Sequence, residues 1–563
     1  MTSSQDRVRT WGFGRIFALV VALGLVLAAC GGGDDDPEGE GETPEDVAGD
    51  PVPGGDLVYG IEAETDGINP TANNFALAAV IMGRAVFDPL AQFDEDGVAQ
   101  PYLAESIEPN DDCTEWTITL RPGITFHDDT PLTSEALKVH FETILAEALV
   151  GLVPKDIFAY DQTQPVSDSN TPVTIVDELT ATISMAIPNC YFPAWLTAQF
   201  GFVGSPTWIL AAEDDPALNQ RPVGTGPFVF DTRQVNARTR FVKNAEYWQE
   251  GQPYLDSVTF VVSTDGQVRA QSLKADDFDI IHTPREDDIE TFRDDDAVKL
   301  YEDPTEEEGF LMFNHEKAPF DDVRARKTII QATNRDEYVD LRSAGLPEIP
   351  TGIFHPDSPF ASEITNYPEY DPEAAVDLAR DYCGDFPENC DGEKIKFQWS
   401  STPSPDSDAD FALFTQQWRD VAVIEKVLIE QANYIVEVAL GQWQATAWRQ
   451  FGNLDPDYDT VWFDSRKIGP ISINWGRIND PELDRLIDEQ RATRDAEERN
   501  EIWREINEIF AEDAHYLWLT HTIWAIVTDT DVQSVTDFEL PDGSKGWPIA
   551  EGRHNLAQIW ISE

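Results

Sequence analysis

Positive charge is scarce in this chain. Its 563 residues include 39 Lys and Arg against 105 Asp and Glu, which gives a formal net charge of −66 at pH 7. A field of that sign repels nucleic acid phosphates and anionic lipid headgroups, so we expect no direct contact with either. We interpret the excess acid as a solvated surface that keeps the chain soluble; the alternative is an acidic surface that binds metal ions.

Familiar catalytic motifs are also lacking. The sequence contains no HExxH, no GxSxG and no Walker loop. Its eight His residues are scattered, and His515 and His521, six apart on a strand-like segment, do not suit a shared ligand face. We therefore predict no catalytic residue, no metal site and no cofactor. The alternative is an enzyme that uses an unrecognised acid pair.

Residues 1–29 predict an export signal. Three arginines precede an uncharged apolar run, Ile16 to Ala29, whose 14 residues fall short of the roughly 20 needed to span a bilayer. The run ends in Leu-Ala-Ala-Cys-Gly, which resembles a bacterial lipobox around Cys30. We predict that Cys30 is lipidated and becomes the mature N-terminus. The alternative is an ordinary secretory signal with an incidental cysteine.

Residues 30–55 predict a disordered acidic tether. They consist mostly of Gly, Pro, Asp and Glu, so they bury too little apolar surface to become ordered. The alternative, a calcium loop, lacks the spaced ligands of an EF-hand. Residues 1–55 together predict a body that is lipid-anchored to the cell membrane on its extracytoplasmic face.

Only five cysteines are present, and four remain once Cys30 carries lipid. An even number in an exported protein is typical of disulfides, and four cysteines allow three pairings. Cys383 and Cys390 are close together in a Gly, Pro and Asn loop and pair most simply with each other, which leaves Cys113 for Cys190. A metal site is the alternative, but the sequence has no CxxC.

The clearest local pattern lies in Trp116 to Leu137. Apolar and polar side chains alternate from Trp116 to Leu120, which predicts a half-buried strand. Pro122-Gly123 predicts a turn, and Ile124 and Phe126 resume the alternation as a second strand. Thr133 is a suitable N-cap for a helix that follows.

The residues of this stretch closely resemble the signature of the extracellular solute-binding proteins of family 5, the peptide and nickel class of ABC importers. The family usually has Gly where this chain has Asp129. Further similarity lies at Asn244 to Tyr254. The motifs that carry the resemblance are Leu120-Arg121-Pro122-Gly123, Phe126-His127-Asp128, Thr130-Pro131-Leu132-Thr133 and Pro222 to Phe230.

The resemblance implies an α/β fold of the two-lobed periplasmic-binding-protein type, with a hinge and with lobe I enlarged by an extra subdomain. It implies lobe I at residues 56–305, with the extra subdomain at about 88–220. Lobe II is then expected at 306–519, and the chain is expected to return to lobe I at 520–563.

The resemblance also implies a function. A solute-binding component of an ABC importer would capture a peptide-like or other polar solute in the interlobe cleft. It would deliver the solute to a membrane permease and, through it, to the ATPase subunits, and we expect it to act as a monomer. The alternatives are a surface-anchored hydrolase and a non-transport sensor on the same fold.

The candidate ligand-binding residues follow from the same resemblance, because the segment that ends in Asp-Pro-Asp lines the cleft in relatives. Trp448 and Phe451 are candidates for stacking on a ligand, and Asn453 for a hydrogen bond; the alternative is that both aromatic side chains belong to the core. Trp475 and Asn314 are further candidates.

One departure bears on the ligand. Dipeptide and oligopeptide binders of the family carry an Asp four residues before the Pro, where it pairs with the α-amino group of the ligand. Alignment on Asp455-Pro456 places Gly452 at that position. A buried ammonium without a partner is costly, so peptide, modified peptide, oligosaccharide and other polar solutes all stay open.

Overall fold

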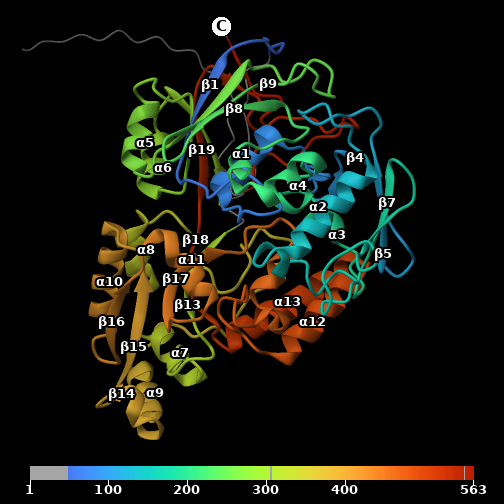
Figure 1. Ribbon diagram of the computed structural model, residues 1–563. Coiled ribbons are helices and arrows are strands. Elements are labelled where there is room, and N and C mark those ends of the chain that lie inside the picture. Colours follow the sequence, from blue (N-terminus) through green and yellow to red (C-terminus); the bar gives the residue numbers. More distant parts are fainter. Residues whose placement is uncertain (1–48, 305–306, 551, 563) are drawn as a thin grey trace, which may run out of the picture. The chain divides into compact units, whose positions relative to one another are not determined.

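The computed structural model describes residues 49–304, 307–550 and 552–562, which all belong to one compact unit. The predicted export signal, Cys30 and most of the predicted tether lie outside the described residues. The first described element is β1, and the strands form two large sheets and one smaller sheet (Figure 1).

The first sheet has seven strands and forms lobe I. β1 is parallel to both of its neighbours, β10 and β11, and the remaining pairs are antiparallel. The strands, in spatial order, are β12 (Val298–Asp303), β19 (Trp524–Asp529), β11 (Ile280–Thr283), β1 (Asp56–Ile61), β10 (Ser257–Val262), β9 (Arg238–Lys243) and β8 (Phe228–Gln234).

The second sheet forms lobe II. Its strand β13, which lies between β17 and β18, is buried along its whole length, as expected for the apolar run Phe310 to Phe313 covered on both faces. β15 is parallel to β16 and β17. The strands, in spatial order, are β14 (Cys390–Asp391), β15 (Lys394–Ser401), β17 (Ala445–Gln450), β13 (Glu308–Phe313) and β18 (Tyr516–His521), and β16 (Ala422–Leu428) pairs with β15.

The chain crosses between these two sheets twice, and the two crossings are neighbours. β12 leads to β13, and β18 leads back to β19; β12 pairs with β19 in the first sheet and β13 with β18 in the second. The sequence predicts one strand-like return from Tyr516 to Val527; the structure divides it into β18 and β19. The predicted domain boundaries stay a prediction, and the sheets change between Asp303 and Glu308 and between His521 and Trp524.

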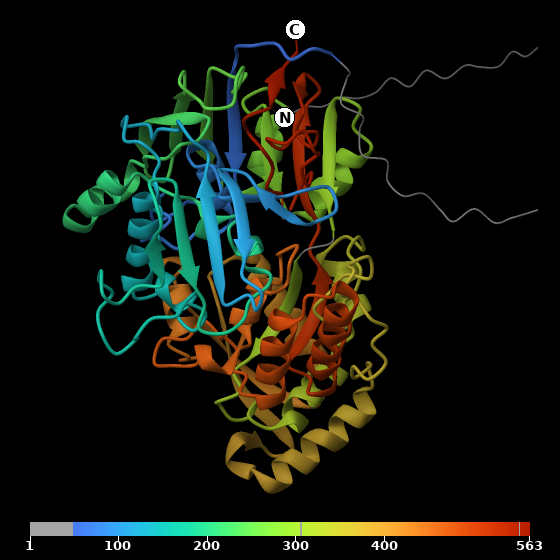
Figure 2. The same cartoon turned by 90° about the vertical axis from the view of Figure 1, so that its right-hand side faces the viewer.

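The third sheet is small and antiparallel, and it faces the viewer in Figure 2. It contains the predicted strand at Trp116, and a disulfide joins Cys113 to Cys190 beside it. A second disulfide joins Cys383 to Cys390, so the two pairs are those predicted from the sequence. The strands are β4 (Ala104–Pro109), β5 (Glu115–Leu120), β7 (Thr180–Ser184) and β6 (Val173–Ile175).

Helices cover the sheets, and two short ladders complete the described strands: β2 (Ala91–Phe93) with β3 (Ala99–Pro101), and β20 (Val532–Gln533) with β21 (Trp560–Ile561). The α-helices are α1 (Leu77–Val86), α2 (Ser134–Ala146), α3 (Phe192–Trp195), α4 (Pro206–Asp214), α5 (Gly266–Leu273), α6 (Glu286–Arg293), α7 (Val323–Gln331), α8 (Arg335–Arg342), α9 (Pro372–Asp385), α10 (Pro405–Gln417), α11 (Gln431–Ala439), α12 (Pro481–Ala492) and α13 (Ala496–Glu512).

Of two local predictions around the turn at Pro122, the second strand is wrong and the helix cap is confirmed in its position only. Ile124 to Phe126 forms no strand, because the chain turns back on itself and keeps only an isolated bridge from Thr125 to Pro131. Asp129 has φ 64°, in the left-handed region that favours Gly, which gives a physical reason for the Gly that the family usually has there. Thr133 occupies the N-cap of α2, but its side chain accepts no capping hydrogen bond.

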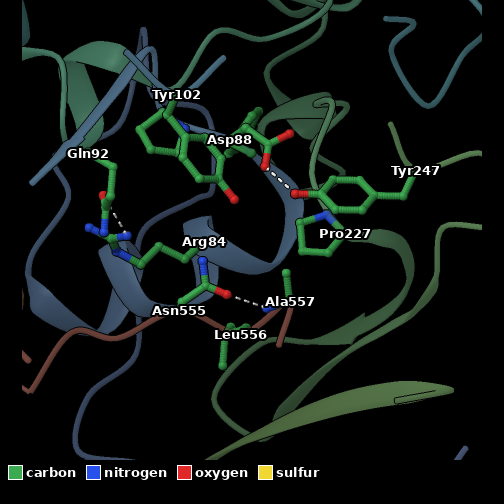
Figure 3. A pocket seen from close by; sticks show the side chains of 11 residues that line it. Arg84, Asp88, Gln92, Tyr102, Pro227, Tyr247, Asn555, Leu556 and Ala557 are labelled. Carbon is green, nitrogen blue, oxygen red and sulfur yellow. Dashed lines mark hydrogen bonds between the residues drawn. The ribbon is translucent and has the colours of Figure 1, made fainter. Parts of the chain in front are cut away.

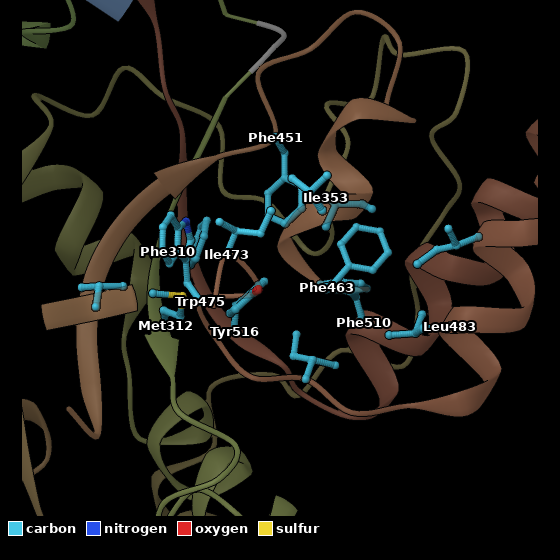
Figure 4. Packing of buried hydrophobic residues seen from close by; sticks show 14 of the residues in the cluster. Phe310, Met312, Ile353, Phe451, Phe463, Ile473, Trp475, Leu483, Phe510 and Tyr516 are labelled. Atoms are coloured by element: carbon cyan, nitrogen blue, oxygen red, sulfur yellow. The ribbon is translucent and has the colours of Figure 1, made fainter. Parts of the chain in front are cut away.

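The core of lobe II is rich in aromatic side chains. Phe310 stacks on Tyr516 with ring centroids 4.4 Å apart, and Phe463 meets Phe510 edge to face at 5.0 Å (Figure 4). These rings join the two crossing strands to α13, so the strands leave lobe II from a tightly packed base.

Candidate functional site

A cavity of about 1040 Å³ lies between the two large sheets. From the first sheet it receives Glu62 and Pro284, which directly follow the parallel strands β1 and β11. From the second it receives Ser401 and Phe451, at the ends of the parallel strands β15 and β17. Ligands bind beyond the carboxyl ends of parallel strands in open α/β sheets, and this cavity faces such ends from both sides.

The crossing strands form part of the same wall. Glu307, Phe310, Thr520 and Trp524 line the cavity along the two crossings. A molecule that fills the cavity therefore contacts both lobes and the segments that join them. Such a site responds to the angle between the lobes.

Tryptophans make up one side of the cavity. Trp448 stacks on Tyr434 with ring centroids 5.5 Å apart, and Trp475 stacks on Trp462 at 5.7 Å. Gln450, with its amide turned to match these neighbours, accepts from the indole N–H groups of Trp475 (2.6 Å) and Trp448 (3.2 Å). The indoles are thus held in place, and Trp448, which is only half-buried, keeps surface for a ligand.

Phe451 also lines the cavity, but most of its ring contacts are with the core. It is 7% exposed and packs near Phe310, Phe510 and Trp518 at centroid distances of 5.9, 6.2 and 5.8 Å (Figure 4). Its φ of 75° lies in the left-handed region. The backbone therefore turns sharply at the end of β17, which brings Gly452 and Asn453 to the cavity.

Asn453 is hydrogen-bonded to the carboxylate of Asp459, a residue that the sequence alone does not mark as a candidate. The Asn453 side-chain amide donates to Asp459 at 2.7 Å and its backbone N–H at 3.3 Å, and Trp462 Nε1 donates at 3.2 Å. Asp459 is 3% exposed and lines the cavity. Burial raises its pKa to about 7, although these hydrogen bonds and the charge of Arg553 oppose the rise.

Asp459 is hydrogen-bonded to Asn453, the residue that follows Gly452. Gly452 is the position where the family's peptide binders carry an Asp. Gly452 lines the cavity and its carbonyl oxygen accepts from Arg553 at 3.0 Å. The chain thus lacks a side-chain carboxylate at 452 but has one on the other side of Asn453. The other acids of this segment are used differently: Asp455 pairs with Arg499 at 2.6 Å, and Asp457 with Arg491 at 2.7 Å.

Acids outnumber arginines around the cavity. Arg342 pairs with Asp410 at 2.6 Å and Asp406 at 3.2 Å, while burial raises the pKa of Glu307, which lies 3.7 Å from Arg449. An acidic wall of this kind favours a solute with positive charge. The acids are Glu62, Glu286, Asp287, Glu307, Asp340, Asp406, Asp410 and Asp459, and the arginines are Arg285, Arg342, Arg449 and Arg553.

Asn314 is not among the residues that line the cavity. It is fully buried, and its amide donates to the carbonyl oxygens of Trp443 (2.9 Å) and Gly441 (3.3 Å). These bonds hold the connection that precedes β17. Asn314 is therefore placed for a structural contact, because a buried amide needs partners and finds them in backbone.

A second, much smaller cavity lies in lobe I, beside α1 (Figure 3). Its volume of about 20 Å³ is near the space of a single water molecule. Asp88 accepts from Tyr247 at 2.8 Å and from Trp248 at 2.9 Å, and burial raises the pKa of Asp88 to about 6. This cavity is too small for a solute.

Among the described residues, the helices are all too short or too polar to pass through a bilayer.

Comparisons with known proteins agree with this architecture. The family model described as "Bacterial extracellular solute-binding proteins, family 5 Middle" matches residues 98–468. A probable di/tripeptide-binding protein 5 from Pseudomonas aeruginosa is 26% identical over 507 residues, 86% of this chain and 94% of that protein. Heme-binding protein A from Haemophilus influenzae is 26% identical over 530 residues, 90% of this chain and 93% of that protein.

A solved structure shows the same fold. The periplasmic binding protein DppA from Helicobacter pylori, in complex with the peptide STSA, has a TM-score of 0.76 and 19% identity. The match covers 91% of this chain and 99% of that one. The ligands for which these proteins are named, or with which they were solved, are di/tripeptides, heme and a peptide, and they differ widely.

Proposed function

Because the chain belongs to the bacterial extracellular solute-binding proteins of family 5, we propose that it captures a peptide-like, cationic solute in the cavity between its lobes. A solute-binding protein of an ABC importer then delivers its ligand to a membrane permease. The single observation that carries the proposal is the cavity itself. It faces the carboxyl ends of parallel strands in both sheets, and both connections between the sheets form part of its wall.

Capture depends on the difference between two states. A solute that touches only one lobe binds the open and closed forms equally, so it does not change the equilibrium between the two forms. Trp448 belongs to the second sheet and Pro284 follows a strand of the first, so a solute between them is bound better when the lobes are closed. The closed form is then the one that a permease recognises.

The charge of the cavity narrows the class of solute. Asp459 offers a buried carboxylate beside Gly452, and the half-buried Trp448 offers a flat apolar surface. An amino-terminal ammonium or a basic side chain suits the carboxylate, and an apolar side chain suits the tryptophan. We propose that Asp459 takes the part of the Asp that position 452 lacks.

We also propose that Cys30 carries a lipid anchor. Cys30 follows the apolar run directly, and lipidation there would fix the body to the membrane through the acidic segment up to residue 55. Each buried CH₂ of an acyl chain contributes about 0.8 kcal/mol, so more than one chain is needed for firm anchoring. The chain would thus work at the extracytoplasmic face, as a monomer.

The test uses the full chain purified in detergent. A basic tripeptide should raise its unfolding temperature in proportion to RT ln(1 + [L]/Kd), and mass spectrometry should recover the peptide unchanged. The N-acetylated form of the same peptide is the matched control and should bind at least about tenfold more weakly.

Two results would contradict the proposal. Recovery of cleaved peptide would point to a hydrolase on the same fold. Equal stabilisation by the free and the acetylated tripeptide would show that Asp459 does not receive the amino group.

A further inference from the structure

Asp480, Asp513 and His515 come together at one end of the helical pair α12 and α13. One side-chain ligand atom from each lies within 4.8 Å of those of the other two. Asp480 directly precedes α12, Asp513 directly follows α13, and His515 directly precedes β18. Two connections of lobe II therefore meet at this point, the one that precedes α12 and the one between α13 and β18.

His515 supplies the observation that marks this cluster as a site. Its side chain is buried, with the residue 4% exposed, and neither ring nitrogen has a hydrogen-bond partner among the residues that the structure describes. A buried polar group without a partner costs free energy of about 1–3 kcal/mol. The imidazole is thus buried within 4.8 Å of two carboxylates and is hydrogen-bonded to neither of them.

The two carboxylates have acceptor positions to spare. Within the described chain the Asp513 carboxylate makes no hydrogen bond or ion pair that would occupy it. Asp480 accepts from the Glu482 backbone N–H at 2.8 Å as the cap of α12, through one oxygen only. Each carboxylate has about four acceptor positions, so capping leaves room for an ion.

The surroundings hold the ligands in place. The side chain of Arg326 donates to the carbonyl oxygens of Asp513 (2.8 Å) and Ala514 (3.2 Å), and so fixes the turn between the two ligands. His315 Nε2 lies 3.3 Å from the carbonyl oxygen of His515. The 17-residue helix α13 ends here, and the partial negative charge of its C-terminus favours a cation. The start of α12 and the guanidinium of Arg326 carry positive charge, which the two carboxylates offset.

We propose that Asp480, Asp513 and His515 bind a divalent first-row transition metal ion. One imidazole nitrogen and two carboxylate oxygens suit Zn²⁺ or Mn²⁺ better than Ca²⁺ or Mg²⁺, which prefer oxygen alone. Ligands of a tetrahedral Zn²⁺ lie about 3.4 Å apart, so the two partly exposed Asp side chains move inward by about 1 Å. The remaining positions of the ion are open to water.

The site is separate from the solute cavity, because none of the three residues lines it. Its metal would join the start of α12 and the end of α13 to β18, the strand that crosses to lobe I. The expected role is structural: the ion fixes the base of one crossing strand.

The test uses the full chain, purified with a chelator and then dialysed, in millimolar Mg²⁺ to occupy the many surface acids. Titration calorimetry with ZnCl₂ should show one site per chain, and Zn²⁺ should raise the unfolding temperature. Added Co²⁺ should give the visible absorption of a nitrogen and oxygen site.

Three variants decide the assignment. Asp480→Asn keeps the helix cap, because Asn caps as well as Asp, and removes the charge. It should weaken Zn²⁺ binding by at least about tenfold, as should Asp513→Asn and His515→Gln. Asp381→Asn, on the exposed face of α9, is the matched control and should leave binding unchanged.

Folding is checked separately. In excess chelator the three variants should unfold within a few degrees of the parent chain, since no ion is then present to lose. Absence of a one-to-one site in the parent chain would overturn the proposal. Binding that survives all three substitutions would overturn it equally.

Discussion

Asp457 and Arg491 form an ion pair that is buried on all sides. Arg491 Nε lies 2.7 Å from Asp457 Oδ1, and the two side chains are 1% and 0% exposed. Asn189 and Trp195, from the connection that follows the third sheet, donate to the other Asp457 oxygen at 2.9 and 2.8 Å. One carboxylate thus joins the extra subdomain of lobe I to the cavity segment of lobe II.

Replacement of this carboxylate should be strongly destabilising. Asp457→Ala leaves Arg491 buried without its partner, and loss of one member of a buried pair costs about 3–5 kcal/mol. Urea unfolding at pH 7 measures the loss. Asp420→Ala removes an exposed acid beside Arg419 and should change the stability by less than about 1 kcal/mol. Equal effects of the two substitutions would contradict the prediction.

The same pair gives a pH dependence of stability. Burial pushes the pKa of Asp457 upward, but Arg491 and Arg499 hold it below its usual range. A carboxyl group whose pKa is lower in the folded chain stabilises the fold above its unfolded pKa of about 3.9. That stability is lost as pH falls below about 4, through the lower folded pKa. In Asp457→Asn the acid limb of a plot of stability against pH should be shallower.

Asp459 should give a pH dependence of stability opposite to that of Asp457. Its folded pKa of about 7 lies above the unfolded value of about 3.9, so the protonated form favours the fold. Stability from this group is complete below about pH 4 and is lost as pH rises to about 7. Asp459→Asn should therefore gain stability relative to the parent at pH 8 and not at pH 4, measured by urea unfolding.

Asp459→Asn should also weaken binding of a cationic peptide by at least about tenfold. In the parent chain this affinity should fall between pH 8 and pH 5, as Asp459 takes up a proton. Calorimetric titrations at the two values measure it. An affinity that does not change with pH would argue against Asp459 as the partner of the ammonium group.

Substitutions of Trp448 and Trp475 should have different effects, because one side chain is placed to contact a ligand and the other packs in the core. Trp448 is half-buried at the cavity, whereas Trp475 is 6% exposed and belongs to the core. Trp475→Ala should cost about 3–5 kcal/mol. Trp448→Ala should cost less stability but lower peptide affinity more. Thermal unfolding with and without peptide measures both effects, and the reverse order would contradict the assignment.

The two disulfides should differ in how much each contributes to the free energy of unfolding. Cys113 and Cys190 are 77 residues apart, and Cys383 and Cys390 are 7 apart. The chain-entropy model gives about 4.5 and about 2.4 kcal/mol for loops of those lengths. Urea unfolding of the Cys113→Ala/Cys190→Ala and Cys383→Ala/Cys390→Ala double variants tests the order. A larger loss from the shorter loop would show that contacts other than loop closure decide the effect.

Local patterns predicted the elements well where side chains decide them. The alternation from Trp116 to Leu120 became β5, and Ile502 and Ile506, four residues apart as on one face of a helix, are buried in α13. An Asp-Pro pair is typical of a helix start, and at the start of α9 Asp371 accepts from two backbone N–H groups. These outcomes follow from contacts within a few residues.

The site was harder to predict, because its contacts span long distances in the chain. Asn314 and Asn453 are both polar candidates by sequence, yet one binds backbone in the core and the other holds Asp459 at the cavity. Asp459 follows Asp455 and Asp457 with the same spacing and differs from them only in its surroundings. The family resemblance predicted the cavity segment, and the fold was needed to show which of these three acids lines the cavity.

The pairing of the two crossings limits how the lobes move. Asp303 is opposite Trp524, the Thr522 N–H donates to the Glu307 carbonyl oxygen at 2.6 Å, and Glu308 is opposite His521. At the residues that the structure describes, the connection is thus a ribbon of two chain segments that are paired side by side. Such a ribbon bends across its flat face far more readily than it bends in its own plane. Opening of the cavity should therefore follow a single arc, and a solute would enter and leave by the same side.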